Sequence, residues 1–336
     1  MRPAGFAFIV GVFVAYAQGA LAPQVAAVQD PPSDIAVQNL ADLQLDANLQ
    51  VELNEAMGRR DYARAETILV REAEHSPKSV RAAKLLSVAG GVFFLDGKYL
   101  NAAIAWKKAD AIAPLEERSR FTLSMAYIKL NRRDWARPEL EKLVVSVPEK
   151  PLYLYWLARL DYDAQSYTTA VARLQKVIEM DPKMMRAYDT LGLCYEYLGK
   201  PEEAIKSYNQ AVGLNRMQLK PSPWPHVDLA LSLIGINRLE DAKKNLDEAL
   251  RYDANLPQAQ YQLGRVLEMQ GKFDTALEAL TKASELDQQY PDPHLALGRL
   301  YHRLGNRQRA ESEIARFKQL KKAHQVSAES PTSLPN

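Results

Sequence analysis

One alanine recurs along the sequence at a fixed interval, and this regularity constrains the fold more than any other feature. The interval is 34 residues from Ala102 to Ala204 and again from Ala242 to Ala310, with a single step of 38 between the two series. A step of 37 extends the pattern back to Ala65. A period of this length indicates an array built from one repeated supersecondary unit, not several unrelated domains.

Other positions keep a residue type when this alanine is numbered 20 in each unit. Position 8 is small in seven of eight units, position 24 is large, and position 15 is glycine or asparagine in six. Glycine and asparagine adopt the left-handed conformation that ends a helix. Positions 4, 7, 8 and 11 share one helix face, and positions 20, 24 and 27 share a face of a second helix. Each unit is therefore predicted to be a helix–turn–helix pair whose apolar faces need a neighbour to cover them.

The unit that begins at 185 shows the pattern most fully, at positions 7, 8, 11, 15, 20, 24 and 27: Leu191, Gly192, Tyr195, Gly199, Ala204, Tyr208 and Ala211. This arrangement resembles the tetratricopeptide repeat (TPR). The resemblance implies an all-α fold, a right-handed α-solenoid of about eight repeats over residues 46–324. The repeats start at 46, 83, 117, 151, 185, 223, 257 and 291. The third unit departs from the pattern, since Pro138 at position 22 predicts that its second helix starts late.

The two ends of the chain differ from the repeats. Arg2 precedes an apolar run with small residues behind it, so residues 1–22 are predicted to be a signal peptide of an exported protein, periplasmic or secreted. The alternative is an uncleaved N-terminal segment that anchors the protein in a membrane. Residues 23–45 are predicted to be a polar linker, and residues 325–336 a disordered tail.

Composition and motifs argue against several function classes. Lys and Arg total 43 against 41 Asp and Glu, so the net charge of +2 gives no field that would attract nucleic acid. Cys194 is the single cysteine, which excludes an intrachain disulfide. The sequence has no His-Glu-x-x-His segment, no phosphate-binding Gly-x-x-x-x-Gly-Lys loop and no Gly-x-Ser-x-Gly. We therefore expect no enzyme activity, no catalytic residue, no cofactor and no metal site.

The resemblance implies that positions 2, 5, 9, 12 and 13 of each first helix line the concave side of the solenoid. Tyrosine and arginine are favoured at protein-binding hot spots, and several occupy these positions. The predicted partner-binding residues are Phe121, Tyr155, Arg159, Tyr162, Tyr197, Tyr261, Arg265, Arg299 and Arg303. The fifth unit also places Asp189, Leu193 and Glu196 on the same stripe.

Packing competes with binding at some of these positions. Tyr155 and Tyr261 either face the groove or pack between repeats, and Arg159 has a possible ion-pair partner in Asp163, four residues on. The sequence predicts a non-enzymatic scaffold that binds a partner protein or peptide, of unknown identity, on the concave TPR surface. The alternative is a membrane-associated assembly or anchoring subunit of a larger envelope complex, which the N-terminus and the basic segment from Arg299 to His324 suggest.

Overall fold

The computed structural model describes residues 40–329, and every regular element in that range is a helix. The chain divides into two compact units, the first ending at Pro114 and the second beginning at Leu115. Within the described range, no helix combines the length and the apolar character needed to cross a bilayer. The predicted signal peptide, residues 1–22, lies outside the described residues.

Unit 1 contains two helical pairs and a short 3-10 helix before them. Its elements are η2 (Leu40–Leu43), α1 (Ala47–Gly58), α2 (Tyr62–Glu74), α3 (Val80–Leu95) and α4 (Tyr99–Asp110). Leu40 and Leu43 are buried in the core that α1, α2 and α3 form. Arg81 holds this segment by donating to the carbonyl oxygens of Leu43 and Gln44, at 3.2 and 3.3 Å. Residues 40–45, which the sequence assigned to a polar linker, are therefore part of the folded unit.

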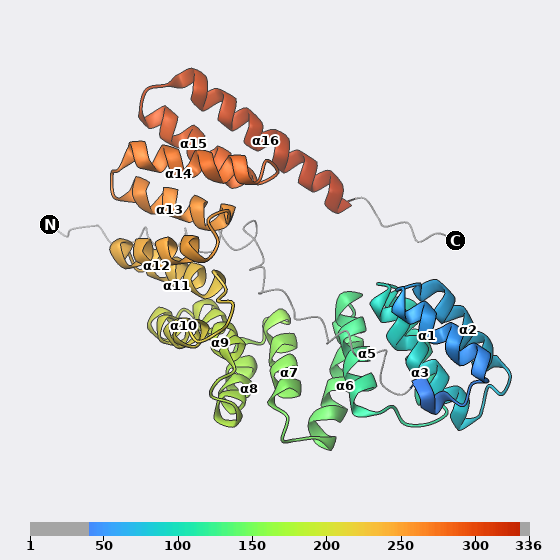
Figure 1. The fold of residues 1–336 in the computed structure, drawn as a ribbon. Coiled ribbons are helices and arrows are strands. Elements are labelled where there is room, and N and C mark those ends of the chain that lie inside the picture. The colour runs from blue at the N-terminus through green and yellow to red at the C-terminus, as the bar shows by residue number, and fades with distance from the viewer. Residues whose placement is uncertain (1–39, 330–336) are drawn as a thin grey trace. The chain divides into compact units, whose positions relative to one another are not determined.

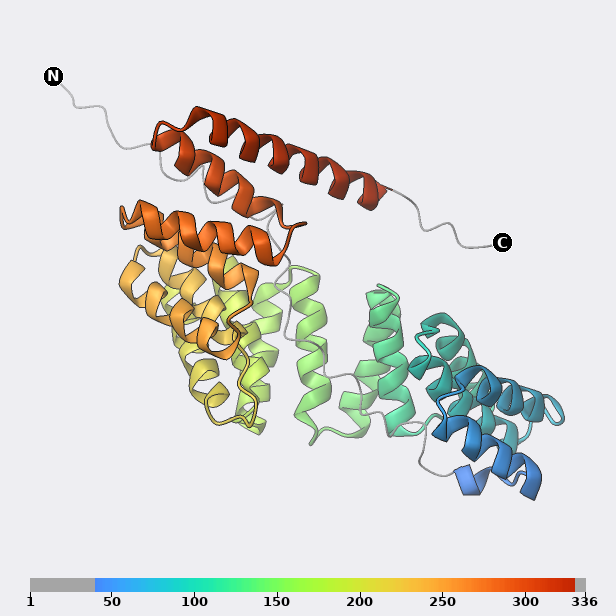
Figure 2. The same ribbon diagram turned by 45° about the horizontal axis from the view of Figure 1, so that its top comes forward.

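Unit 2 contains six further pairs. Their first helices are α5 (Glu117–Lys129), α7 (Pro151–Asp163), α9 (Met185–Tyr197), α11 (Trp224–Gly235), α13 (Pro257–Met269) and α15 (Pro291–Arg303). Their second helices are α6 (Arg133–Ser146), α8 (Tyr167–Met180), α10 (Pro201–Asn215), α12 (Leu239–Tyr252), α14 (Phe273–Leu286) and α16 (Arg307–Glu329). Within unit 2 each helix packs on the next, as Figures 1 and 2 show. The first helices from α7 to α15 also contact one another in sequence, and we call the surface they form the first-helix surface.

Left-handed residues join the two helices of every pair. Position 15 has a positive φ in all eight pairs, at Arg60, Gly97, Asn131, Gln165, Gly199, Asn237, Gly271 and Gly305. The sequence identified six of these turns from glycine and asparagine. The other two adopt the same conformation with φ of 59° at Arg60 and 60° at Gln165, because the flanking helices fix the turn. Helix packing thus overrides the local preference at both positions.

The two helices of a pair approach closely where the sequence places small residues. The repeated alanine at position 20 is buried in all eight pairs. In four pairs, a glycine at position 8 lies directly under the side chain at position 24. A Cβ atom at Gly192 would stand 2.5 Å from Cε1 of Tyr208, and one at Gly264 would stand 2.6 Å from Cγ of Leu280. Because glycine has no side chain, the paired helices can approach this closely at position 8.

Three helix ends differ from the expected ones. Helix α6 begins at Arg133, so the prediction that Pro138 delays it is wrong. Proline removes only the hydrogen bond to the carbonyl of Asp134, and the buried residues Ala136 and Leu140 hold the helix on both sides of it. Helix α3 begins at Val80, three residues before the expected start of that repeat at 83. Helix α16 runs to Glu329 and so includes the first residues of the segment expected to be a disordered tail.

Candidate binding surface

All nine predicted partner-binding residues lie in unit 2, on the first helices α5, α7, α9, α13 and α15. The structure divides them into a group on α7 and α9, a group on α13 and α15, and one residue on α5. That residue is Phe121, which is half-buried with its ring centre 5.2 Å from that of Tyr153 on α7. The ring of Phe121 thus packs within the array.

Three tyrosines from α7, α8 and α9 form an aromatic cluster. Tyr167 and Tyr197 are stacked, with 4.7 Å between ring centres and 7° between planes. Tyr162 meets both edge-on, at 5.7 and 5.8 Å. The guanidinium carbon of Arg159 lies 4.9 Å from the centre of the Tyr162 ring. Tyr162 is buried, whereas Tyr197 is 49% exposed and gives the cluster an aromatic face open to solvent.

The two tyrosines at position 5 have different surroundings. Tyr155 is 3% exposed, and its hydroxyl lies 3.5 Å from the hydroxyl of Thr190 on α9. Its ring is therefore packed between α7 and α9. This burial corrects the prediction that Tyr155 is one of the partner-binding residues. Tyr261 is half-buried with its ring centre 5.4 Å from that of Tyr290, which precedes α15.

Two of the three predicted arginines on α13 and α15 are exposed, whereas the third, Arg265, is half-buried like Arg159 on α7. Arg265 donates to the side-chain oxygen of Gln262 at 2.8 Å. Arg303 forms an ion pair with Glu268 at 3.4 Å and stays exposed. Arg299 is exposed too. These side chains keep a positive edge on the first-helix surface, at its C-terminal end.

Carboxyl groups from α9 and α11 gather beside the aromatic cluster. Asp189 and Glu196 stand three residues before and four residues after Gly192, so all three share one face of α9. The ring of Tyr208 crosses α9 at Gly192, where a side chain would block it. Asp228 on α11 is 8% exposed and lies one turn before Ser232, whose hydroxyl donates a hydrogen bond to Glu196. We call Asp189, Glu196, Asp228 and the Tyr208 hydroxyl the acidic site.

Burial raises the pKa of every group in the acidic site. The pKa of Asp189 rises to about 7, because burial outweighs the favourable charge of Arg159. The pKa of Asp228 is raised well above its ordinary value, first by burial and then by the charges of Asp189 and Glu196. Burial also raises the pKa of Glu196, although the Ser232 hydroxyl donates a hydrogen bond to its carboxylate and the Tyr208 hydroxyl, just beyond hydrogen-bond distance, also favours the ionised form. Ionising a carboxyl group in the acidic site therefore costs more free energy than ionising one in water.

Buried polar atoms without a hydrogen-bond partner concentrate at this site. They include Oδ1 of Asp189, the hydroxyl oxygen of Tyr208 and Nη1 of Arg159. The pKa of Tyr208 is raised by burial and then by the charges of Glu196, Asp228 and Asp189, which places its hydroxyl among the carboxyl groups. Buried polar groups in folded proteins nearly always have a partner, so these atoms indicate a place for water or a ligand.

Comparison with protein families identifies the repeated unit. A model described as "TPR repeat" matches residues 269–305, and two models described as "Tetratricopeptide repeat" match residues 186–216 and 257–280. These matches fall on the pairs α9–α10, α13–α14 and α15, where the sequence and the structure show the repeat. The chain contains tetratricopeptide repeats.

Solved structures of other TPR proteins share the fold. A TPR protein from Parabacteroides merdae is 18% identical, with a TM-score of 0.57 over 71% of this chain and 92% of its own. PilW, a type IV pilus biogenesis factor, is 18% identical, with a TM-score of 0.54 over 65% of this chain and 94% of its own. PilF of Pseudomonas aeruginosa is 19% identical, with a TM-score of 0.52 over 63% and 94%. A search of curated proteins finds no match to the sequence.

Sequence reasoning missed part of the acidic site in this TPR protein. It placed Asp189 and Glu196 on the groove-lining stripe but selected only tyrosines and arginines as binding residues. Asp228 occupies position 6, which is not on that stripe. Tyr208 was assigned to packing at position 24, where the other units have leucine, isoleucine or tryptophan. A hydroxyl at a position otherwise apolar, opposite a glycine, is the signal that could have identified it.

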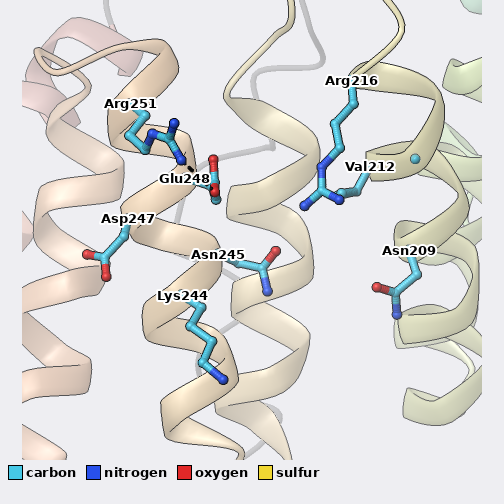
Figure 3. A pocket seen from close by; sticks show the side chains of 9 residues that line it. Asn209, Val212, Arg216, Lys244, Asn245, Asp247, Glu248 and Arg251 are labelled. Atoms are coloured by element: carbon cyan, nitrogen blue, oxygen red, sulfur yellow. Dashed lines mark hydrogen bonds and ion pairs between the residues drawn. The ribbon is translucent and has the colours of Figure 1, made fainter.

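A separate pocket lies between the second helices α10 and α12 of the TPR array (Figure 3). It has a volume of about 600 Å³ and is lined by Asn209, Val212, Gly213, Arg216, Lys244, Asn245, Asp247, Glu248 and Arg251. Arg251 and Glu248 form an ion pair across 2.9 Å within it. None of the predicted binding residues lines this pocket, so it is not part of the first-helix surface.

Cys194 lies on α9 between the acidic site and the aromatic cluster. Its side chain is buried, and burial raises the pKa of the thiol to about 12. Because the thiolate is the reactive form, this cysteine acts as a packing residue in the TPR core.

Proposed function

We propose that this TPR protein is a non-enzymatic scaffold that binds a partner protein or peptide along the first-helix surface of unit 2. The observation that carries the proposal is the combination, on α7 and α9, of an exposed aromatic ring with buried polar atoms that have no partner. Tyr197 supplies the ring, and Asp189 and Arg159 supply two of the polar atoms. Arg265, Arg299 and Arg303 extend the proposed contact towards α15.

The chemistry of this surface suits recognition of a chain segment. Tyrosine offers a large contact area at a small cost in side-chain entropy, and arginine can donate two parallel hydrogen bonds to carbonyl or carboxylate oxygens. An extended peptide or a helix laid along successive first helices would meet such residues at regular intervals. The residues proposed to contact the partner are Arg159, Tyr197, Tyr261, Arg265, Arg299 and Arg303, and the buried ring of Tyr162 supports Tyr197 from behind.

Site-specific cross-linking tests this proposal in the full chain. A photoreactive phenylalanine analogue replaces Tyr197 in one variant and Lys176, exposed on the second helix α8, in a matched variant. We expect illumination in the native cell to give one discrete conjugate from position 197 and none from position 176. Equal conjugates from both positions, or none from position 197, would contradict the proposal.

A second candidate function is assembly or anchoring at an envelope membrane. Helix α16 favours it, because it carries the exposed cations Arg307 and Arg309, and a structurally similar protein is described as a pilus biogenesis factor. Several α16 cations already act within the fold, however: Arg309 lies over the ring of Tyr301, and Arg316 donates to the Gln288 carbonyl.

We propose export through residues 1–22, with a mature soluble protein that begins after them. N-terminal sequencing of the protein from fractionated cells distinguishes cleavage from anchoring.

A further inference from the structure

The structure assigns a chemical class to the residue that the acidic site receives. We infer that the acidic site binds a lysine or arginine side chain of the partner peptide, held between the carboxyl groups of α9 and α11 and beside the aromatic cluster. This inference rests on the proposed function and adds the identity of one contact to it. It concerns Asp189, Glu196, Asp228 and Tyr208, which nothing in the sequence pattern marks as a binding set.

Charge is the first argument for a cationic occupant. The hydrogen bond from Ser232 to Glu196 brings this face of α11 against α9, so the charges of the three carboxyl groups act on one another, and the charge that opposes them is Arg159, which acts on Asp189. Arg159 is itself engaged, because Asp163 lies 3.5 Å from its Nη2 atom. An additional positive charge in this place would remove the mutual repulsion of the carboxylates, and the site would then gain from ionising all three.

The unpartnered atoms match the hydrogen bonds that such an occupant makes. Oδ1 of Asp189 and the Tyr208 hydroxyl oxygen can each accept a hydrogen bond. An ammonium group offers three N–H donors and a guanidinium five, with no acceptor to leave unsatisfied. Nη1 of Arg159 needs an acceptor, and a backbone carbonyl of the same peptide supplies one. A cationic residue in a chain therefore satisfies all three buried atoms together.

The aromatic cluster adds a second feature that selects a cation. Tyr197, which is 49% exposed, directly follows Glu196 on α9, so the two side chains leave the helix on neighbouring faces about 100° apart. The faces of aromatic rings attract ammonium and guanidinium groups. A metal ion fits less well, because no three acidic, histidine or cysteine side chains in residues 40–329 are placed to hold one ion together. An organic cation reaches the carboxyl groups and the ring with one side chain.

Selection from a random library tests this inference with a defined probe. The full chain is used at pH 8 to select from phage-displayed 12-residue peptides. The enriched peptides are then made synthetically, with each lysine replaced by norleucine or each arginine by citrulline. We expect a shared lysine or arginine position, and a loss of at least tenfold in affinity when that residue is made neutral.

Variants of the site connect this loss to the acidic site. In Asp228→Asn and in Glu196→Gln, the difference between the cationic and neutral peptides should fall to about threefold, because each variant removes one of the three carboxylates that distinguish them. Glu179→Gln, an exposed carboxylate on α8, is the matched control and should keep the tenfold difference. Glu196 is the most accessible of the three residues, although its carboxyl end lies against α11, so its variant remains informative if Asp228→Asn folds poorly.

The outcomes separate the inference from the proposed function. The inference would be overturned by peptides whose binding requires Tyr197 but whose affinity is unchanged when norleucine replaces lysine or citrulline replaces arginine. The proposed scaffold function would still stand in that case. Peptides whose cation matters equally in Glu196→Gln and Asp228→Asn would also overturn it. A selection that enriches no peptide would count against the proposed function, and with it against the inference.

Discussion

Tyr208 and Gly192 together determine which polar group the pair α9–α10 places beside the carboxyl groups of α9 and α11. Because Gly192 has no side chain, the ring of Tyr208 crosses α9 and its hydroxyl reaches the carboxyl groups of α9 and α11. The neighbouring pairs α7–α8 and α11–α12 have alanine at position 8 and leucine at position 24 instead. At these two positions the neighbouring pairs make only apolar contacts, so two substitutions bring a buried hydroxyl group beneath α9 in this pair alone among the three.

The first prediction concerns this pair. Gly192→Ala should destabilise the protein by about 1–3 kcal/mol, because the added Cβ overlaps the Tyr208 ring. Adding Tyr208→Leu recreates the Ala–Leu combination of the adjacent pairs and should recover part of the loss. Urea unfolding of the two single variants and the double variant measures the coupling. Strictly additive effects would show that the ring and the glycine do not determine each other.

The second prediction concerns the left-handed turn at Gln165, where φ is 60°. Gln165→Gly should raise the free energy of unfolding by about 0.5–1 kcal/mol. Glycine removes the steric strain of the left-handed conformation, and this gain exceeds the additional backbone entropy that glycine loses on folding. Gly271→Ala, at the equivalent turn between α13 and α14, should lower it by about 1 kcal/mol. Thermal unfolding of both variants checks the opposite signs. A stabilising Gly271→Ala would refute the explanation.

At the scale of the element, α6 shows that tertiary packing outweighs a helix-breaking residue. Proline six residues into a helix removes one hydrogen bond and crowds the preceding turn. Here the helix continues because Ala136, Leu140 and Leu143 are buried on the face that packs within unit 2. The burial of that face contributes more than the proline costs, and so α6 starts at the same repeat position as its counterparts and has the same length as α8, α12 and α14.

The third prediction follows from this balance. Pro138→Ala should stabilise the protein by about 1–2 kcal/mol, since it restores the N–H that bonds to the Asp134 carbonyl and removes the clash of the ring. Urea unfolding of the full chain measures it. A matched substitution, Pro291→Ala at the first residue of α15, should have a much smaller effect, because no intrahelical bond is missing there. Equal effects would mean that the hydrogen bond in α6 is not the cause.

The sequence predicts the helices well because the same residue pattern recurs in eight units, so a departure in one unit does not hide it. Spacing alone located the position-8 and position-24 contacts and six of the eight left-handed turns. It failed where one copy departs from the others for a tertiary reason, as at Pro138 and Gln165. The acidic site was not predicted as a set, because Asp228 and Tyr208 reach it from α11 and α10, and their meeting depends on the packing of three successive helices.

For the molecule as a whole, the buried carboxyl groups of unit 2 make stability depend on pH. Burial raises the pKa of Asp189 and Asp228, so the folded chain holds their protons more tightly than the unfolded chain does. The groups that face them are Arg159 on α7, Glu196 on α9 and Tyr208 on α10. The stability that these protons contribute is complete below the ordinary pKa of aspartate and is lost as the pH rises towards and through the raised values.

The fourth prediction is the signature of that linkage. The melting temperature of Asp228→Asn should match that of the wild type near pH 4 and exceed it at pH 8, by on the order of a few degrees. Calorimetry at several pH values gives the difference. Glu179→Gln should show no such growth with pH. A difference that stays constant from pH 4 to pH 8 would indicate that Asp228 is ionised at no cost in the folded protein.

The buried thiol of Cys194 has a practical consequence for experiments on this protein. Since it is the single cysteine and its pKa is raised to about 12, thiol-reactive dyes and spin labels should leave the native chain unmodified. A cysteine introduced at any exposed site then becomes the one labelled position without removal of Cys194. Pairs of such positions, one in each unit, would let fluorescence energy transfer measure the distance between the units in solution.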